Sequence, residues 1–300
     1  MCRHLAYLGP PTPVGELLTR GPHSLRTQSW APREMRGGGT INADGFGVAW
    51  WLPAEAAPED HGAGVTWHGG ARPDPVDEAR AAAAAAQEHP AGAPTVSRYR
   101  NAAPIWTDPA VEEVLPQLRS RAVLAAIRSA TVGMPVERAA CAPFTYGRWA
   151  FSHNGAIPDW RRALSTVAAQ FDSPSLLEAE ALTDSAALWV ILRRLLERGA
   201  SHPGAAAAPD DVLRRVTAAV LAESPRARLN LLLGDGETIW ATTWHHSLSV
   251  RVTDEYAVVA SEPYDDDPRW EAIGDRMLVR VRPGWKSVDS LENELGRATS

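Results

Sequence analysis

Short apolar segments bounded by glycine, proline or polar residues occur at the start of the chain and again through its last third. Such segments predict buried β-strands, because strands are short and are interrupted by turn-forming residues. The pattern predicts strands over residues 2–9, 45–52, 122–129, 149–153, 228–233, 238–243, 248–252, 256–260 and 277–281.

Apolar residues recur at helical spacing in the middle of the chain, most clearly over residues 182–197. Helices are also expected at 15–19, 109–119 and 210–222. An alanine-rich segment at 77–94 is a candidate for a short helix, because alanine has the highest helix propensity. Strands followed by helices and then by strands again predict an α+β arrangement of layers and not a regular βαβ repeat.

A long segment at 21–44 is rich in glycine and proline and has neither helical nor strand periodicity. Long loops inside compact domains are either disordered or functional. We expect a functional loop, because side chains able to bind a ligand replace the Ser, Glu and Lys of a solvating linker. These side chains are His23, Gln28, Trp30, Arg33 and Arg36.

Composition narrows the class of protein. The 300 residues carry 30 Lys and Arg against 36 Asp and Glu, for a net charge of −6, and no dense cationic stretch. Nucleic-acid binding requires clustered cations, so a small-molecule partner is expected instead. No apolar run approaches the roughly 18 residues of a membrane span, and the N-terminus lacks the pattern of a secretory signal. The sequence therefore predicts a cytoplasmic protein without a membrane segment.

Cys2 follows the initiator methionine, so removal of Met1 would place a thiol and a free α-amine on one residue. An α-amine has a pKa of about 7.7–8.0 and can take the proton of the thiol, whose pKa is about 8.5. This pairing is typical of an N-terminal nucleophile. The alternative is an ordinary buried cysteine near a terminus. Cys141 is expected to be a small buried apolar residue.

Histidines offer weaker candidates. His245 and His246 are adjacent, but neighbouring residues of a strand point to opposite faces and no third ligand lies at a recognisable spacing, so no metal site is assigned. His4 and His153 are expected to be buried core histidines. Neither a metal nor any other cofactor is expected.

Several blocks of sequence resemble the class II glutamine amidotransferases, which attack γ-glutamyl amides with a terminal cysteine. One branch, the hydrolases of ergothioneine biosynthesis, is resembled most closely through residues 22–25, 28–33, 37–42 and 260–268. The resemblance implies a four-layer αββα N-terminal-nucleophile hydrolase sandwich. It also implies one domain over 2–300 with alanine-rich insertions near 77–94 and 199–209. The blocks shared with the whole family are 1–9, 42–50, 127–133, 151–155 and, more weakly, 182–185.

The resemblance also implies roles for individual residues. Cys2 is expected to be the nucleophile, and Asn154 and Gly155 to supply the oxyanion hole. Arg128 is expected to bind the α-carboxylate of the glutamyl group, and Asp184 its α-ammonium. Alternatives remain open from the residues alone, because Asn-Gly is typical of a hairpin turn and an aspartate near a helix start is a common cap.

Trp30, in the 21–44 loop, is expected to contact substrate, because substrates of this branch carry a trimethylammonium group and aromatic faces bind quaternary cations. Val132 departs from the family, whose ammonia-producing members often have histidine there. Water is the expected acceptor, since the length leaves no room for a synthase domain. Two other readings stay open: another γ-glutamyl hydrolase or glutaminase subunit, and a non-catalytic γ-glutamyl-binding subunit. The oligomeric state is not predicted.

Overall fold

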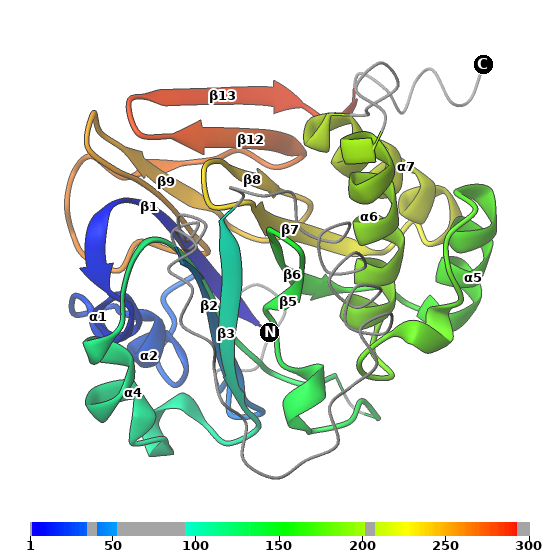
Figure 1. Ribbon diagram of the computed structural model, residues 1–300. Coiled ribbons are helices and arrows are strands. Elements are labelled where there is room, and N and C mark those ends of the chain that lie inside the picture. The colour runs from blue at the N-terminus through cyan, green and yellow to red at the C-terminus, as the bar shows by residue number, and fades with distance from the viewer. Residues whose placement is uncertain (1, 35–40, 53–93, 132, 202–207, 293–300) are drawn as a thin grey trace, which may run out of the picture.

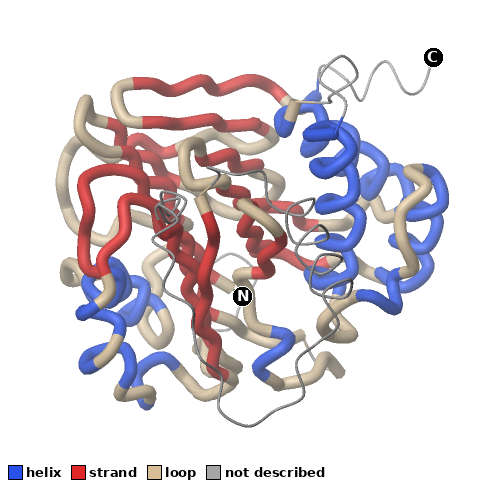
Figure 2. The backbone as a smooth tube through the Cα atoms, in the orientation of Figure 1, coloured by secondary structure: helices blue, strands red, loops and turns tan. Residues whose placement is uncertain are grey.

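A computed structural model describes residues 2–34, 41–52, 94–131, 133–201 and 208–292. The predicted helix at 77–94, apart from its last residue, and much of the predicted insertion at 199–209 lie outside these ranges. No helix in the described ranges is long and apolar enough to span a membrane. Two sheets lie between two groups of helices, as Figure 1 and Figure 2 show.

The larger sheet has seven strands, and each strand is antiparallel to its neighbours. Their spatial order is β11-β9-β10-β1-β4-β2-β3. The strands are β1 (Arg3–Pro13), β2 (Phe46–Leu52), β3 (Thr95–Asn101), β4 (Arg119–Ile127), β9 (Ser249–Val252), β10 (Ala257–Ala260) and β11 (Glu271–Ala272).

The smaller sheet has six antiparallel strands in the order β13-β12-β8-β7-β6-β5. Its strands are β5 (Phe144–Tyr146), β6 (Trp149–Ala156), β7 (Arg228–Gly234), β8 (Ile239–Thr242), β12 (Met277–Arg282) and β13 (Trp285–Ser290). Each of the nine predicted strands coincides with a strand of one of the two sheets.

Strand alternation explains the layers, because successive side chains of a strand point to opposite faces. In β1, Leu5 and Tyr7 pack with α1 (Val14–Thr19), α2 (Leu25–Gln28) and the segment around α4 (Ala110–Glu113). Ala6 and Leu8 instead face the space between the sheets, where they join residues of the smaller sheet such as Leu232. The N-terminal strand is therefore buried on both faces, which accounts for its nearly unbroken apolar run.

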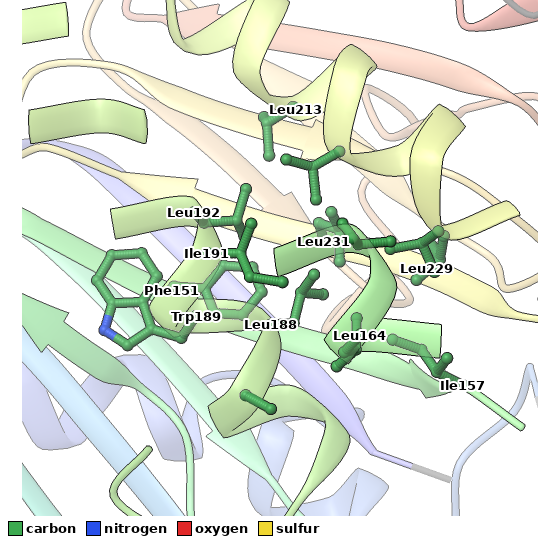
Figure 3. Close-up of a cluster of buried hydrophobic side chains, with 14 of the residues drawn as sticks. Phe151, Ile157, Leu164, Leu188, Trp189, Ile191, Leu192, Leu213, Leu229 and Leu231 are labelled. Atoms are coloured by element: carbon green, nitrogen blue, oxygen red, sulfur yellow. The ribbon is translucent and has the colours of Figure 1, made fainter. Parts of the chain in front are cut away.

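The other helical layer covers the outer face of the smaller sheet (Figure 3). It consists of α5 (Trp160–Gln170), α6 (Asp184–Ser201) and α7 (Pro209–Glu223). Phe151 of β6 stacks on Trp189 of α6 with ring centroids 5.4 Å apart. Together with the two sheets and the α1, α2 and α4 layer, this arrangement confirms the predicted four-layer α+β sandwich.

Three predicted boundaries are wrong. β1 continues through the expected proline break to Pro13, with a shift in its pairing to β4 between Leu8 and Thr12; prolines are tolerated where the ladder is irregular. The helix predicted at 109–119 is α4 followed by one 3₁₀ turn, since Pro116 interrupts it and Arg119 already belongs to β4. The 21–44 loop contains α2, whose start is capped by the Ser24 side chain.

Candidate active site

The Cys2 side chain is half-buried at the start of β1. Arg3 pairs with Ile127, the last residue of β4, so Cys2 lies beside the chain that continues from β4. The Cys2 Sγ is 3.7 Å from the carbonyl oxygen of Ser129. The antiparallel register thus brings the N-terminal thiol to Arg128 and Ser129.

A small cavity at this end of the sandwich is lined by both Cys2 and Arg128. Arg128 is mostly buried, and its Nη1 donates to the carbonyl oxygen of Pro135 at 2.8 Å. The structure therefore brings together the predicted nucleophile and the predicted carboxylate-binding cation. The remaining lining residues are Ala126, Ile127, Ala140, Ala142, Phe144, Ser152, His153 and Ser185.

Asn154 and Gly155 belong to β6, which continues through them and pairs with β7. The alternative reading of this dipeptide as a hairpin turn is therefore wrong. The Asn154 side chain is fully buried, and its Nδ2 lies 3.5 Å from the Ser261 Oγ. A Cβ on Gly155 would lie 1.9 Å from the carbonyl oxygen of Arg228, so only glycine fits there. These two residues adjoin the lining residue His153 but do not themselves line the cavity.

Asp184 is the first residue of α6 and is nearly buried. Its Oδ1 accepts the backbone N–H of Ser185 at 2.8 Å, and its Oδ2 accepts that of Ile157 at 3.0 Å. Asp184 thus ties the start of α6 to the end of the Asn154 strand. Ser185 continues this connection, because its Oγ is 3.1 Å from the Nδ1 of His153.

Trp30 lies two residues after the end of α2 and does not line the cavity that contains Cys2. Its side chain is 43% exposed and meets Trp106 edge to face, with ring centroids 5.8 Å apart. Trp106 is itself 37% exposed. Two aromatic rings at right angles are therefore partly exposed to solvent. The sequence pointed to Trp30 but not to Trp106.

The predicted core histidines are buried as expected. His153 has both ring nitrogens within hydrogen-bond distance of partners, the Ser185 Oγ and the carbonyl oxygen of Arg228. Burial, together with the smaller effects of His153 and Arg3, lowers the pKa of His4 to about 3. His4 is therefore a neutral imidazole near pH 7.

His246 is also buried, and burial followed by the charge of Arg228 lowers its pKa to about 3. In the parts of the chain with described coordinates, no group of three His, Cys, Asp or Glu side chains is arranged to hold a metal ion. Cys141 is fully buried, and burial raises the pKa of its thiol to about 11. This confirms the expectation for Cys141.

Ser261 and Glu262 are two buried residues that adjoin the site and have no role predicted from the sequence. The Ser261 Oγ accepts the backbone N–H of His4, two residues after the thiol. The Glu262 carboxylate lies 3.8 Å from the guanidinium of Arg3. The available signal was their place in the 260–268 block, through which the chain resembles the hydrolase branch of the family.

Known proteins similar to this chain were identified by sequence. The family model described as glutamine amidotransferases class-II matches residues 22–253. The chain is 36% identical over 282 residues to the gamma-glutamyl-hercynylcysteine sulfoxide hydrolase of Mycolicibacterium smegmatis, covering 94% of this chain and 96% of that protein. It is 35% identical over 296 residues to the protein of the same name from Mycobacterium tuberculosis, covering 99% of each chain.

A solved structure provides a comparison of the fold. The glutamine aminotransferase class-II domain protein from Silicibacter pomeroyi superposes with a TM-score of 0.53. The match covers 96% of this chain and 99% of that chain at 21% identity. At this identity the similarity concerns the arrangement of the sheets and helices.

Proposed function

Because this chain belongs to the class II glutamine amidotransferases, we propose that it hydrolyses the γ-glutamyl amide bond of γ-glutamyl-hercynylcysteine sulfoxide. The products are glutamate and hercynylcysteine sulfoxide, an intermediate of ergothioneine biosynthesis. Similarity over nearly the whole length of the two mycobacterial hydrolases supports this choice of substrate. The observation that carries the chemistry is the shared cavity of Cys2 and Arg128.

Cys2 attacks the γ-carbonyl carbon. With Met1 removed, its α-amine takes the thiol proton and then delivers it to the leaving nitrogen as the amide C–N bond breaks. The glutamyl group remains on sulfur as a thioester. Water then adds to this thioester, the C–S bond breaks, and glutamate leaves while the thiol regains a proton.

Asn154 and Gly155 supply the donors for the oxyanion formed in both steps. The Asn154 Nδ2 lies 3.5 Å from the Ser261 Oγ, which keeps the amide beside the strand that carries the thiol. The strand fixes the Gly155 backbone beside it. Removal of one such donor typically raises the barrier by about 2.7–4 kcal/mol.

Arg128 and Asp184 recognise the glutamyl group as a zwitterion. A guanidinium binds a carboxylate through two parallel hydrogen bonds, so Arg128 takes the α-carboxylate. The Asp184 carboxylate already accepts two backbone N–H groups and the Ser185 hydroxyl. Its two oxygens carry about four lone-pair sites, so it retains capacity for the α-ammonium of the substrate.

Trp30 and its neighbour Trp106 offer exposed aromatic faces for the trimethylammonium group of the hercynyl portion. A cation over such a face gains about 0.5–2 kcal/mol.

The same proposal places the enzyme in the cytoplasm as one domain over 2–300 with no nucleic-acid partner. Its acceptor is water.

A panel of γ-glutamyl amides tests the proposal through glutamate release. The panel contains the hercynylcysteine sulfoxide conjugate, the same conjugate without its trimethylammonium group, γ-glutamylcysteine and glutamine. We expect the highest kcat/KM for the full conjugate and no release by Cys2→Ala. Equal or higher kcat/KM for glutamine would replace this substrate with the glutaminase alternative. Hydrolysis retained in Cys2→Ala would contradict the thiol mechanism.

A further inference from the structure

Glu262 is a buried carboxylate that holds the segment leading away from Trp30. Its side chain is 1% exposed and follows the end of β10. Both of its oxygens accept the backbone N–H of Arg33 at 3.1 Å, and Oε2 also accepts that of Glu34 at 2.8 Å. Glu262 therefore fixes the backbone of the 33–34 segment through hydrogen bonds to two successive N–H groups.

The same carboxylate faces Arg3, the residue next to the nucleophile. The Arg3 side chain is fully buried, and its Nε lies 3.8 Å from the Glu262 Oε2. Its other nitrogens donate to the carbonyl oxygens of Glu34 at 2.7 Å and Cys2 at 3.3 Å. One buried ion pair thus connects the peptide carbonyl of the nucleophile to the 33–34 segment.

Ser261 makes the corresponding connection between the two sheets. Its backbone N–H donates to the carbonyl oxygen of His4 at 2.9 Å, and its Oγ accepts the His4 N–H at 3.0 Å. The Asn154 Nδ2 approaches the same Oγ at 3.5 Å. The carbonyl oxygen of Ser261 accepts a hydrogen bond from the Ser247 hydroxyl at 2.9 Å. A single hydroxyl therefore lies between the strand that carries the thiol and the amide assigned to the oxyanion.

We propose that Ser261 and Glu262 are positioning residues, which hold the Cys2 backbone, the Asn154 amide and the 33–34 segment in one fixed arrangement. This inference rests on the proposed function, because it assigns these residues no chemistry apart from that of Cys2 and Asn154. Misplacement of reacting groups by about 1 Å can cost about a hundredfold in rate. Two side chains that fix both groups therefore control kcat without touching substrate.

The two residues have different expected effects. Ser261→Ala removes the acceptor beside Asn154 and leaves the glutamyl-binding groups intact, so kcat falls about tenfold while KM stays within about twofold. Glu262→Gln places an amide NH₂ against backbone N–H groups and removes the negative charge that lies 3.8 Å from the Arg3 guanidinium. The 33–34 segment and the N-terminal residue then loosen, so kcat falls about tenfold while iodoacetamide alkylates Cys2 about threefold faster.

Alkylation is read from the intact mass of the N-terminal peptide and needs no substrate. The buried thiol of Cys141 serves as an internal reference in the same sample. Asp235→Asn is the matched control, because the Asp235 carboxylate is also buried, accepts two backbone N–H groups and pairs with an arginine, Arg148, but does not line the cavity that contains Cys2. If Glu262→Gln does not fold, the double variant Arg3→Gln/Glu262→Gln removes both buried charges and takes its place.

Wild-type kcat together with wild-type alkylation in folded Ser261→Ala and Glu262→Gln would overturn the proposal. A fall in kcat that Asp235→Asn shows to the same extent would overturn it as well. The alkylation measurement distinguishes failure of the positioning proposal from failure of the proposed function, because it needs no substrate. If the wild-type chain releases no glutamate from any γ-glutamyl amide, the proposed function fails, whereas faster alkylation in Glu262→Gln still supports the positioning role.

Discussion

The Cys2 sulfur lies 3.7 Å from the carbonyl oxygen of Ser129, although 127 positions separate the two residues. Two neighbouring antiparallel strands cause this proximity, since β1 begins where β4 ends. The same register places Arg128 on the wall of the cavity that contains the thiol. A nucleophile and a cation able to hold the substrate carboxylate are therefore positioned by backbone pairing and not by a mobile side chain.

Arg128→Lys should raise KM about tenfold, a loss of about 1.4 kcal/mol, because an ammonium cannot make two parallel hydrogen bonds to a carboxylate. Steady-state kinetics of glutamate release measures the change. Arg119→Lys is the matched control, since Arg119 also donates to a proline carbonyl, that of Pro11, but at the far end of β4. An unchanged KM in Arg128→Lys would exclude this residue from carboxylate binding.

Gly155→Ala should destabilise the fold by about 3 kcal/mol, the upper end of the usual cost of overpacking. The added methyl carbon would lie 1.9 Å from the Arg228 carbonyl oxygen and 2.4 Å from the His153 Nε2. Urea unfolding followed by tryptophan fluorescence measures the loss. Gly274→Ala should change stability by no more than about 0.5 kcal/mol, because the nearest atom to its added carbon is 3.8 Å away. Equal stability of the two variants would contradict the packing described for Gly155.

Periodicity was sufficient to predict most of the buried elements. All nine predicted strands are present, because each has an apolar side that faces a layer of the core. The long helix α6 was also predicted, since its apolar spacing reflects burial against β6 and its neighbours. The edge strands β3 and β13 were not predicted. Their sequences alternate weakly and carry charged side chains such as Arg98 and Lys286, as expected where one face meets solvent.

The helix α5 was not predicted, and its start lacks a standard signal. Asp159, which precedes it, adopts a left-handed backbone conformation and makes no side-chain cap. The site was predicted largely through family resemblance, and its supporting residues were not. Ser261 and Glu262 act through contacts with His4, Arg3 and the 33–34 segment, and sequence spacing carries no information about such long-range contacts.

The buried neutral histidines should make the fold sensitive to acid. Burial lowers the pKa of both His4 and His246 to about 3, whereas an unfolded histidine titrates near 6.5. Between these values the unfolded chain binds more protons than the folded chain. The free energy of unfolding should therefore fall as pH drops from about 6.5 toward 3, by about 1.4 kcal/mol per pH unit for each histidine.

Chemical denaturation at a series of pH values measures this slope. His246→Leu should reduce the slope of the unfolding free energy against pH by the contribution of one histidine. His23→Leu, which removes a partly exposed histidine near Asp266, serves as the comparison. The same slope in wild type and His246→Leu would show that His246 is protonated in the folded protein, contrary to its burial.

Trp30→Ala and Trp106→Ala should each raise KM for the trimethylammonium-bearing conjugate about threefold to tenfold, from the loss of one cation–π contact. KM for the conjugate without that group should stay unchanged, because the two rings then have no cation to bind. Trp285→Ala is the control, since its ring contacts Arg280 and Arg282 on the smaller sheet. Equal effects on both conjugates would remove the tryptophans from recognition of the cation.

The central claim is that the thiol at position 2 carries the glutamyl group, and trapping that thioester tests it most directly. The chain is mixed with the γ-glutamyl conjugate, quenched in acid within the first turnover and measured by intact mass. We predict protein without Met1 that gains the mass of one glutamyl group on Cys2, and no such gain in Cys2→Ala. Glutamate release at the wild-type rate by Cys2→Ala, or a glutamyl adduct on another residue, would contradict the account.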